Sequence, residues 1–281
     1  MPELPEVETI RRVLQDVLPG HRITAVHTGR PNMLRGQDPR AFVDGLEGRR
    51  VETVDRRGKF LLIRLDRKTL LVHLGMTGQI FACSDERGTC IPKPRPGLPD
   101  KHTHLQMTLT HGLRLFFRDA RMFGRYSLID AQEEHVLIHR LGPEPLGSRF
   151  TARVLFDKTR GHRTSIKALL LDQRVVAGVG NIYADESLFR AGIRPETQAG
   201  ELTQEQAGKL HRAVRKVLRE AVHSGGTTLS DYLDPRDRRG TFQWKLHVYG
   251  RQGEPCFRCG DRILKSVVAQ RGTHWCPRCQ T

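Results

Sequence analysis

Four of the six cysteines stand in two identically spaced pairs near the C-terminus. The pairs read CFRC, at Cys256 and Cys259, and CPRC, at Cys276 and Cys279, with sixteen residues between them. Two such pairs about 15 to 20 residues apart are typical of four thiolates that bind one zinc ion. The metal would fold this segment into a compact module, with ILKSVVA and THWC as a hairpin turning at QRG. In a reducing cytoplasm, two disulfides are the weaker alternative.

The remaining cysteines, Cys83 and Cys90, lie far from these pairs. They border a stretch, 83–101, that contains four prolines and several charges. Because proline disrupts both helices and strand ladders, we expect an exposed, mobile loop here. We expect both thiols to be free, in or near that loop.

The charge of the chain points to a polyanionic partner. Lys and Arg number 47 against 31 Asp and Glu, which gives a net charge of +16 and a pI of about 10.2. The phosphate backbone of nucleic acid is the commonest partner of so basic a protein, and an acidic membrane surface is the alternative. No stretch approaches the roughly 18 apolar residues of a membrane-spanning helix. The acidic N-terminus also lacks the features of a signal peptide, so we expect a cytoplasmic protein.

The first half of the chain reads mainly as short strands. Between Lys59 and Asp130 these are KFLLIRL, TLLVHLGM, LQMTLT, LRLFFRD and RYSLID, separated by turn residues. Such a succession favours an antiparallel sandwich or barrel. A helix is predicted before them, from Pro5 to Leu18. Its apolar face would contain Val7, Ile10, Leu14 and Leu18.

Beyond residue 150 the pattern becomes helical. SIKALLLDQ begins one helix, and after a glycine turn Asn181 stands at the predicted N-cap of a second, which ends at Gly192. Thr203 and Gln206 form a capping-box pattern before an amphipathic helix that SGG ends. The stretch 227–251 has no clear period, so it is predicted to be a long loop with functional potential.

The chain opens on MPELPEVETI, in which Pro2 and Glu3 stand ahead of the first predicted helix. Removal of Met1 would leave Pro2 with a free secondary amine. An amine can attack the anomeric carbon of a sugar and form an iminium, or Schiff-base, intermediate. Glu3, or Glu6 a turn later, is placed to supply a proton. Taken alone, however, these residues are explained equally well as the lead-in to a helix.

Together these segments resemble the bacterial formamidopyrimidine-DNA glycosylases, base-excision repair enzymes related to endonuclease VIII. The resemblance runs through PELPEVET, RRGKFLL, HLGMTG, DARMFG, LGPEPL, DQRVVAGVGNIYADESLFRAGIRP, GGTTLSDYL, VYGRQGEPC and AQRGTHWCPRCQ. It implies an α+β multidomain fold. An N-terminal β-sandwich domain with an N-terminal helix would occupy 1–140 and a linker 141–152. A helix–two-turns–helix domain with a lesion-capping loop would occupy 153–250, and a four-cysteine zinc-finger hairpin 251–281.

The resemblance also implies roles for single residues. Pro2 would be the nucleophile and Glu3 the proton donor. Lys59 would assist β-elimination, while Arg271 would hold the phosphate beside the lesion and support δ-elimination. The single zinc ion would be structural, because four thiolates leave no open position for water.

Eight further residues match positions at which the family contacts DNA. Lys167 and Asn181 would grip phosphates, since a helix N-terminus favours anions. A flipped-out base leaves a vacancy in the duplex. Met76, Arg121 and Phe123 would fill it. The residues expected at or near the DNA backbone are His73, His102 and His162.

The chain departs from the family pattern in three places. DARMFG replaces Asp-Pro-Arg-Arg-Phe-Gly, so Ala120 and Met122 alter the segment that faces the opposite base. In KHTH, Thr103 replaces an aspartate near His102. RRGTFQ, with Thr241, replaces a Lys-Pro-Gly-Tyr-Phe stretch of the lesion-capping loop, which changes how the damaged base would be recognised.

We therefore expect a bifunctional DNA glycosylase and lyase. It would remove oxidised purines, such as 8-oxoguanine and formamidopyrimidines, through a Schiff base at Pro2, and would cleave the strand by β,δ-elimination. Its partner would be double-stranded DNA containing oxidised bases or abasic sites. We expect a monomer in the bacterial cytoplasm, associated with the nucleoid.

Two other functions compete with this one. An endonuclease VIII-type enzyme for oxidised pyrimidines would share the nucleophile and the zinc finger, but Leu4 argues against it, because that group typically has glycine there. Met76, Arg121 and Phe123 argue the same way. A non-catalytic zinc-ribbon DNA-binding protein would explain the charge and the cysteines, but not Pro2 and Glu3.

Overall fold

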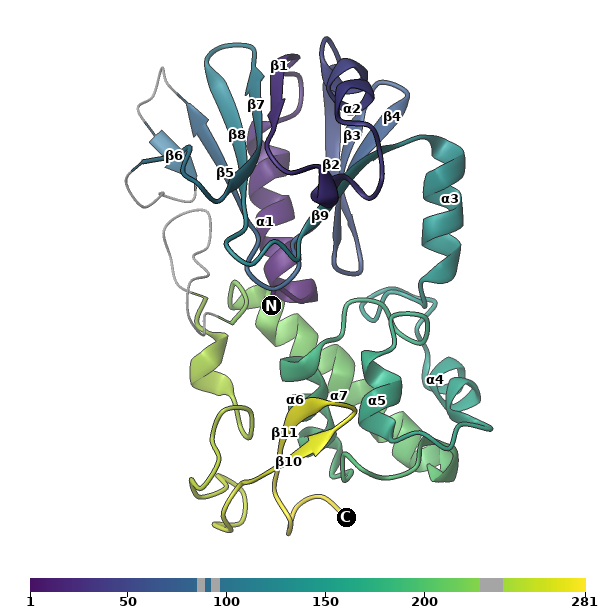
Figure 1. Ribbon diagram of the computed structural model, residues 1–281. Helices are drawn as coiled ribbons and strands as arrows, with labels where there is room; N and C mark the ends of the chain where they lie inside the picture. Colours follow the sequence, from purple (N-terminus) through teal and green to yellow (C-terminus); the bar gives the residue numbers. More distant parts are fainter. Residues whose placement is uncertain (85–88, 92–96, 228–239) are drawn as a thin grey trace. The chain divides into compact units, whose positions relative to one another are not determined.

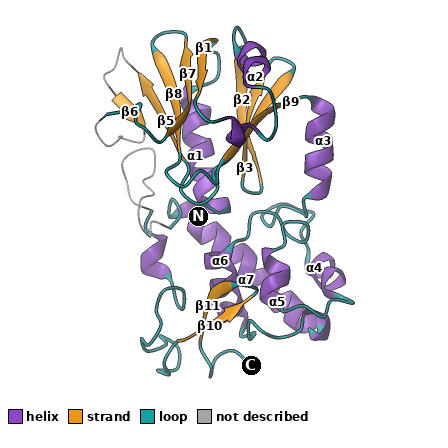
Figure 2. Cartoon of the chain, in the orientation of Figure 1, coloured by secondary structure: helices purple, strands orange, loops and turns teal. Residues whose placement is uncertain are grey.

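The computed structural model describes residues 1–84, 89–91, 97–227 and 240–281 (Figure 1). The chain forms two compact units, one of residues 1–139 with 225–241 and one of residues 140–224 with 242–281. Strands predominate in the first unit and helices in the second (Figure 2). None of the helices in the described part of the chain is long and apolar enough to cross a membrane.

The first unit contains two antiparallel sheets and the helix α1 (Leu4–Val17). One sheet has the order β1-β7-β8-β5-β6, and the other has the order β2-β3-β4-β9. The strands are β1 (Ile23–Thr28), β2 (Val51–Arg57), β3 (Phe60–Leu65), β4 (Lys68–His73), β5 (Gln79–Ser84), β6 (Thr89–Ile91), β7 (Thr103–Leu109), β8 (Leu113–Arg118) and β9 (Arg125–Ile129). Three shorter helices complete this part of the chain: η1 (Pro31–Leu34), α2 (Pro39–Leu46) and α3 (Ala131–Arg140).

One apolar core joins the two sheets and α1. Ile63 of β3 and Met107 of β7 belong to the same buried cluster as Leu14 of α1, so the sheets form the predicted sandwich. The outer face of β3 is covered as well, because Leu62 packs in a second cluster with Leu137 of α3. Burial on both faces explains why KFLLIRL is a continuous apolar run and does not alternate.

The five predicted strands correspond to β3, β4, β7, β8 and β9, and the first helix begins one residue before its predicted start. Four more strands of the described chain, β1, β2, β5 and β6, were not predicted. In β1 and β2 most side chains are exposed or half-buried. Their sequences therefore lack the apolar pattern that marks a strand in isolation.

The prediction for Cys83 and Cys90 was wrong. The two residues face each other on the neighbouring strands β5 and β6, with Cα atoms 3.8 Å apart, and form a disulfide. Strand β5 and the short β6 also occupy part of the stretch expected to be a loop, while residues 85–88 and 92–96 lie outside the described chain. The pairing depends on strand register, which spacing in the sequence does not reveal.

The second unit is a helical bundle with a small hairpin. Its helices are α4 (Ala152–Thr159), α5 (Ile166–Leu171), α6 (Asn181–Ala191), η2 (Ala199–Glu201), α7 (Gln204–His223) and η3 (Phe242–Lys245). Apolar side chains of α5, α6 and α7 form one buried cluster. The capping box at Thr203 and the left-handed Gly192 bound α7 and α6 as predicted. Asn181 is the first residue of α6, however, and Gly180 is its N-cap.

The hairpin consists of β10 (Leu264–Val268) and β11 (Arg271–Trp275). Val268 pairs with Arg271, so Ala269 and Gln270 form a two-residue turn, and both have positive φ. The turn therefore lies one residue earlier than QRG predicts, and Arg271 begins the second strand. Of the predicted loop 227–251, residues 228–239 lie outside the described chain, and η3 forms part of the remainder.

Candidate functional site

Pro2 and Glu3 lie directly before α1. Glu3 is the N-cap residue in an extended conformation, and its side chain is buried, with 1 % of the residue exposed. Its N–H donates to Oε2 of Glu6 at 2.8 Å. A buried carboxyl therefore stands next to the residue that would become the N-terminus once Met1 is removed.

Glu6 holds this N-terminal segment against a distant part of the same unit. Its Oε1 accepts a hydrogen bond from the N–H of Thr227 at 2.7 Å, across 221 positions of sequence. Gly226 makes the close approach possible, because it has φ +85° and a Cβ there would lie 2.8 Å from Oε1 of Glu6. Only glycine suits both the conformation and the space.

Lys59 lies in the two-residue turn between β2 and β3, after Gly58, and is buried. Its charge acts on His73, whose ring packs against Phe60 on the paired strand. Burial lowers the pKa of His73 to about 4, and the charges of Lys59, Arg35 and Arg125 act in the same direction. The imidazole is thus neutral near pH 7. Because Nδ1 accepts the N–H of Gly75 at 3.1 Å, its proton resides on Nε2.

The structure brings Met76, Arg121 and Phe123 together. Gly75 packs so closely against the chain at Phe123 that a Cβ on it would lie 2.5 Å from that backbone. Arg121 is exposed with its guanidinium over the ring of Phe123, at 5.1 Å from the centroid. Phe123 itself is 50 % exposed, so part of its apolar ring faces solvent.

Asp119, which was not among the expected site residues, organises these three residues. The carboxylate is fully buried and accepts hydrogen bonds from the hydroxyl of Thr77 at 2.5 Å and from the N–H groups of Arg121 and Gly124 at 3.2 and 2.7 Å. Asp119 therefore fixes two turns, the one that contains Thr77 and the one that contains Arg121 and Gly124. The only local signal was its position as the first residue of DARMFG.

Of the other two candidate histidines, His102 is hydrogen-bonded to this group through its backbone, and His162 belongs to the second unit. His102 is half-buried before β7, and its N–H donates to Asp100 at 3.1 Å, while its carbonyl accepts the N–H of Asp119. Asp100 thus supplies a carboxylate close to where Thr103 replaces one. His162 is exposed in the turn after α4, in the second unit, where its carbonyl accepts the N–H of Gly200.

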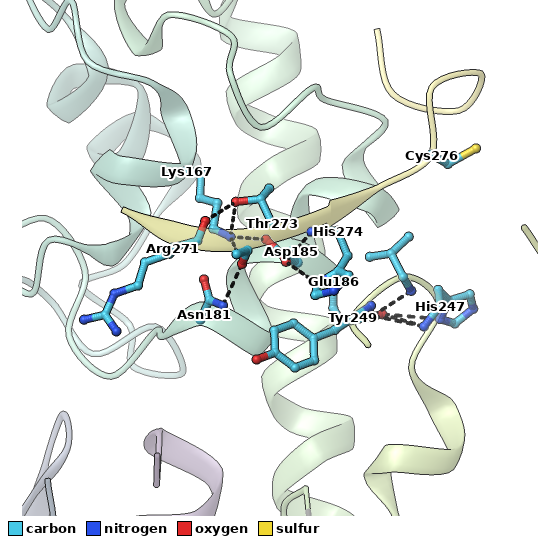
Figure 3. Close-up of polar contacts among 12 residues, drawn as sticks. Lys167, Asn181, Asp185, Glu186, His247, Tyr249, Arg271, Thr273, His274 and Cys276 are labelled. Carbon is cyan, nitrogen blue, oxygen red and sulfur yellow. Dashed lines mark hydrogen bonds and ion pairs between the residues drawn. The ribbon is translucent and has the colours of Figure 1, made fainter. Parts of the chain in front are cut away.

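Lys167 was expected to bind a phosphate, but the structure buries its side chain. Its side chain is 0 % exposed, and Nζ pairs with Oδ1 of Asp185 at 2.6 Å (Figure 3). The ammonium also donates to the hydroxyl of Thr273 at 2.7 Å and to the carbonyl of Gly272 at 3.2 Å. A buried ammonium with these partners has no surface for DNA. Lys167 binds the zinc-finger hairpin instead.

Asn181 and Asp185 fix the same strand from α6. Nδ2 of Asn181 donates to the carbonyl of Gly272 at 2.9 Å, and Oδ2 of Asp185 accepts the N–H of His274 at 2.8 Å. Arg271, directly before these residues, is exposed, and its side chain points away from the network (Figure 3). Lys167, Asn181 and Asp185 therefore fix the backbone next to Arg271, while the guanidinium of Arg271 remains accessible.

Glu186, the next residue of α6, holds the chain that leads into the zinc finger. It is fully buried and accepts the N–H groups of His247, Val248 and Tyr249 at 2.9 to 3.0 Å. Adjacent carboxylates of one helix thus bind β11 on one side and residues 247–249 on the other (Figure 3). Neither carboxylate was predicted, because ADES reads locally as an ordinary helical turn.

The four paired cysteines form a metal site. Their sulfur atoms all lie within 4.8 Å of one another, with 3.9 Å between Cys256 and Cys279 and 3.4 Å between Cys259 and Cys276. Tetrahedral zinc with Zn–S bonds of about 2.3 Å requires sulfurs about 3.8 Å apart, so the site fits one structural ion. The alternative of two disulfides is wrong, because these four thiols are unpaired.

The ionisation of the thiols also calls for a cation. Burial raises the pKa of Cys256, but the N–H groups of Arg258 and Cys259 lower it, and the balance leaves it at about 7. Burial and the neighbouring sulfurs raise the pKa of Cys279 to about 12. Four crowded thiolates repel one another unless a metal ion neutralises them.

The buried ion pair yields a first prediction. Lys167→Met leaves the carboxylate of Asp185 buried without its counter-charge, and this should destabilise the second unit by about 3–5 kcal/mol. Adding Asp185→Asn removes the charge but keeps an acceptor for His274, so the double variant should regain most of the loss. Urea unfolding followed by Trp275 fluorescence measures both, in a Trp244→Phe background that leaves one tryptophan. A loss below about 1 kcal/mol in the single variant would contradict this assignment.

Zinc removal yields a second prediction. In the same Trp244→Phe background, chelation or Cys276→Ser should expose Trp275, now buried on β11, and shift its emission to longer wavelength. Small four-thiolate modules usually need their metal to fold. The first unit has its own core and should keep its β-sheet circular dichroism. Unchanged Trp275 emission in metal-free protein would show that the module folds without metal.

Three domain families match the chain in succession. These are the formamidopyrimidine-DNA glycosylase N-terminal domain at residues 1–126, the formamidopyrimidine-DNA glycosylase H2TH domain at residues 141–232, and the zinc finger found in FPG and IleRS at residues 253–281. The order is the one that the sequence motifs imply.

Full-length relatives agree with these matches. Formamidopyrimidine-DNA glycosylase of Symbiobacterium thermophilum is 45% identical over 282 residues, which cover 100% of this chain and 89% of that protein. A Lactococcus lactis FPG mutant in complex with a Fapy-dG containing DNA matches with a TM-score of 0.89, 36% identity and 100% coverage of both chains. The Lactococcus lactis Fpg complex with an abasic site containing DNA matches with a TM-score of 0.89 and 35% identity over 99% of both chains. The chain therefore belongs to the formamidopyrimidine-DNA glycosylase family.

Proposed function

We propose that the protein removes oxidised purines from DNA through a Schiff base at Pro2 and then cleaves the strand by β,δ-elimination. As a member of its family it is a DNA glycosylase of base-excision repair. The observation that carries the proposed chemistry is the placement of the buried Glu3 beside Pro2, at a helix start held by Glu6. If Glu3 only preceded a helix, its carboxyl would not need to be buried.

Base release begins with the amine that Pro2 gains when Met1 is removed. Its nitrogen attacks C1′ of the damaged nucleotide, so a C–N bond to the protein forms while the bond to the base breaks. Glu3 donates a proton to the departing base or to the opening sugar. The C1′–O4′ bond breaks as the sugar opens, and the proton that the amine nitrogen loses goes to whichever of O4′ and the base Glu3 does not protonate. The products are the released base and a ring-opened iminium that links the sugar to Pro2.

Strand cleavage follows from the iminium. It acidifies the C2′ proton, whose loss expels the 3′ phosphate in β-elimination, and Lys59 assists this step. A second elimination expels the 5′ phosphate and leaves a gap with phosphates at both ends. Arg271 supports this step by binding the phosphate beside the lesion, for which its fork-shaped guanidinium is suited. The zinc ion holds the finger together and takes no part in bond breaking.

Base flipping costs a few kcal/mol, because the nucleotide must leave the stack. Met76, Arg121 and Phe123 fill the vacancy. Their grouping on two turns fixed by Asp119, and the exposure of Phe123, support this role. An exposed aromatic ring that lies beneath a guanidinium offers a flat face against which bases can stack.

Double-stranded DNA with an oxidised base or an abasic site is the partner. The Lactococcus lactis complexes contain a Fapy-dG or an abasic site, and the net charge of +16 suits a polyanion. Asn181, His102, His162 and the neutral His73 supply polar contacts to the backbone. The protein acts as a monomer, and its substrate places it at the nucleoid in the bacterial cytoplasm. Endonuclease VIII-type activity on pyrimidines is the second candidate, which the retained Leu4 disfavours.

The two opening residues should separate the two halves of the chemistry. Glu3→Gln keeps the amine of Pro2 but removes the acidic proton, so release of 8-oxoguanine should fall about 10²–10⁴-fold. The same variant should still nick a preformed abasic site, where no base has to leave. Single-turnover assays on the two duplexes measure the contrast. Equal losses on both substrates would remove Glu3 from base release.

The matched control is a form of the protein that retains Met1. Its Pro2 nitrogen is part of an amide, so borohydride should trap no covalent complex on either duplex. If this form still cross-links to damaged DNA, the nucleophile is an internal lysine, with Lys59 the first candidate.

Binding to an abasic-site duplex should be strongly salt-dependent. If about five of the lysines and arginines behind the net charge of +16 neutralise phosphates, the slope of log affinity against log salt concentration should be about −4 to −5. Arg271→Ala should reduce its magnitude by about one. The double variant Lys167→Met/Asp185→Asn should keep the full slope, because Lys167 is buried. A reduced slope in the double variant would show that Lys167 contacts phosphate after all.

A further inference from the structure

A groove with a volume of about 590 Å³ lies within the second unit. It is bounded by the last turn of α6 at Arg190 and Ala191, by one face of α7, and by the zinc-finger segment at His247 and Arg258. Its volume is typical of a ligand-binding cleft. Asn181, which anchors the hairpin, is at the opposite end of α6 from Arg190, about 14 Å along the helix axis.

The groove is strongly basic. Arg190 pairs with Glu220 at 2.7 Å, and Lys209 pairs with Glu205 at 2.8 Å. The other basic side chains that line it are Arg212, Lys216 and Arg258. None of them forms a salt bridge within the described part of the chain. Lys209, and after it the charge of Arg212, nevertheless lowers the pKa of Glu205. Burial raises the pKa of Glu220, but Arg190, and after it the charge of Lys216, brings it below its usual value. Arg212 and Lys216 lie four residues apart on α7 and so share one face of the helix.

Aromatic rings border the basic residues. Arg258 lies over the ring of Phe189 at 4.7 Å, and His247 contacts both Phe189 and Phe257. Phe257 is 71 % exposed, although Arg251 covers one face of its ring at 3.5 Å. Arginine beside aromatic rings is the composition that dominates the binding energy of protein–protein interfaces.

We propose that this groove binds an acidic peptide segment of a partner protein. Three cations without a salt bridge supply charge complementarity, and the exposed ring of Phe257, next to His247 of the groove, supplies apolar contact for side chains between the acidic ones. The carboxylate of Glu220 lies inside the groove. Its ion pair with Arg190 interrupts the basic lining, so this part of the groove offers no cation to a nucleic-acid strand, which carries a negative charge at every repeat. A peptide can place a neutral residue there.

A fluorescein-labelled hexaglutamate peptide tests the proposal by fluorescence anisotropy on the zinc-bound full chain. Arg212→Glu and Lys216→Glu should each raise the dissociation constant at least tenfold. The matched control is Arg219→Glu, an equal charge reversal at an exposed position of α7 outside the groove, which should change it less than twofold. Equal weakening by Arg212→Glu and Arg219→Glu would mean that only net charge matters, and would overturn the proposal.

A second measurement separates the groove from the DNA-binding surface. A saturating abasic-site duplex should leave peptide binding within twofold, and displacement of the peptide by the duplex would overturn the assignment. If Arg212→Glu weakens binding of a second duplex and not of the peptide, the groove is a nucleic-acid site and the proposal fails. None of these readouts depends on catalysis, so they remain informative even if the proposed chemistry at Pro2 is incorrect.

Discussion

The position of the zinc finger depends on two neighbouring carboxylates in the middle of α6. The finger has a small apolar core, which Phe189 of the same helix helps to form. Asp185 and Glu186 are fully buried and accept backbone N–H groups from segments on the two sides of that helix. A buried carboxylate without its donors is costly, so the segments that donate are fixed where the carboxylates require them. The metal folds the finger, while these carboxylates attach it to α6.

The first unit uses the same device. Asp119 and Glu6 are buried acids that accept N–H groups from turns, and each fixes a segment that carries residues proposed to act on DNA. In both units, buried carboxylates thus hold some of the residues proposed to contact DNA. Rigid support of this kind matters because misplacement of a catalytic group by about 1 Å can cost about 10²-fold in rate.

Features with a local cause could be predicted from the sequence. The long helix α7 has its own cap and apolar face, and the four cysteines have a spacing typical of a metal site. Pairings between distant segments could not be predicted. Strand β1 is recognisable only beside β7, where Ile23 meets Leu109, and the disulfide requires the register of β5 against β6. Lys167 was misassigned because a resemblance identifies a position but not its burial.

The first unit is discontinuous in sequence, since Glu6 and Gly226 belong to it while residues 140–224 between them belong to the other unit. The polypeptide therefore passes from one unit to the other three times, near residues 139, 224 and 241. A fragment cut at residue 140 would lack the backbone donor that Glu6 requires. Exchange of one unit between related genes would need three matched crossovers, so the two units are constrained to evolve as a single inherited block.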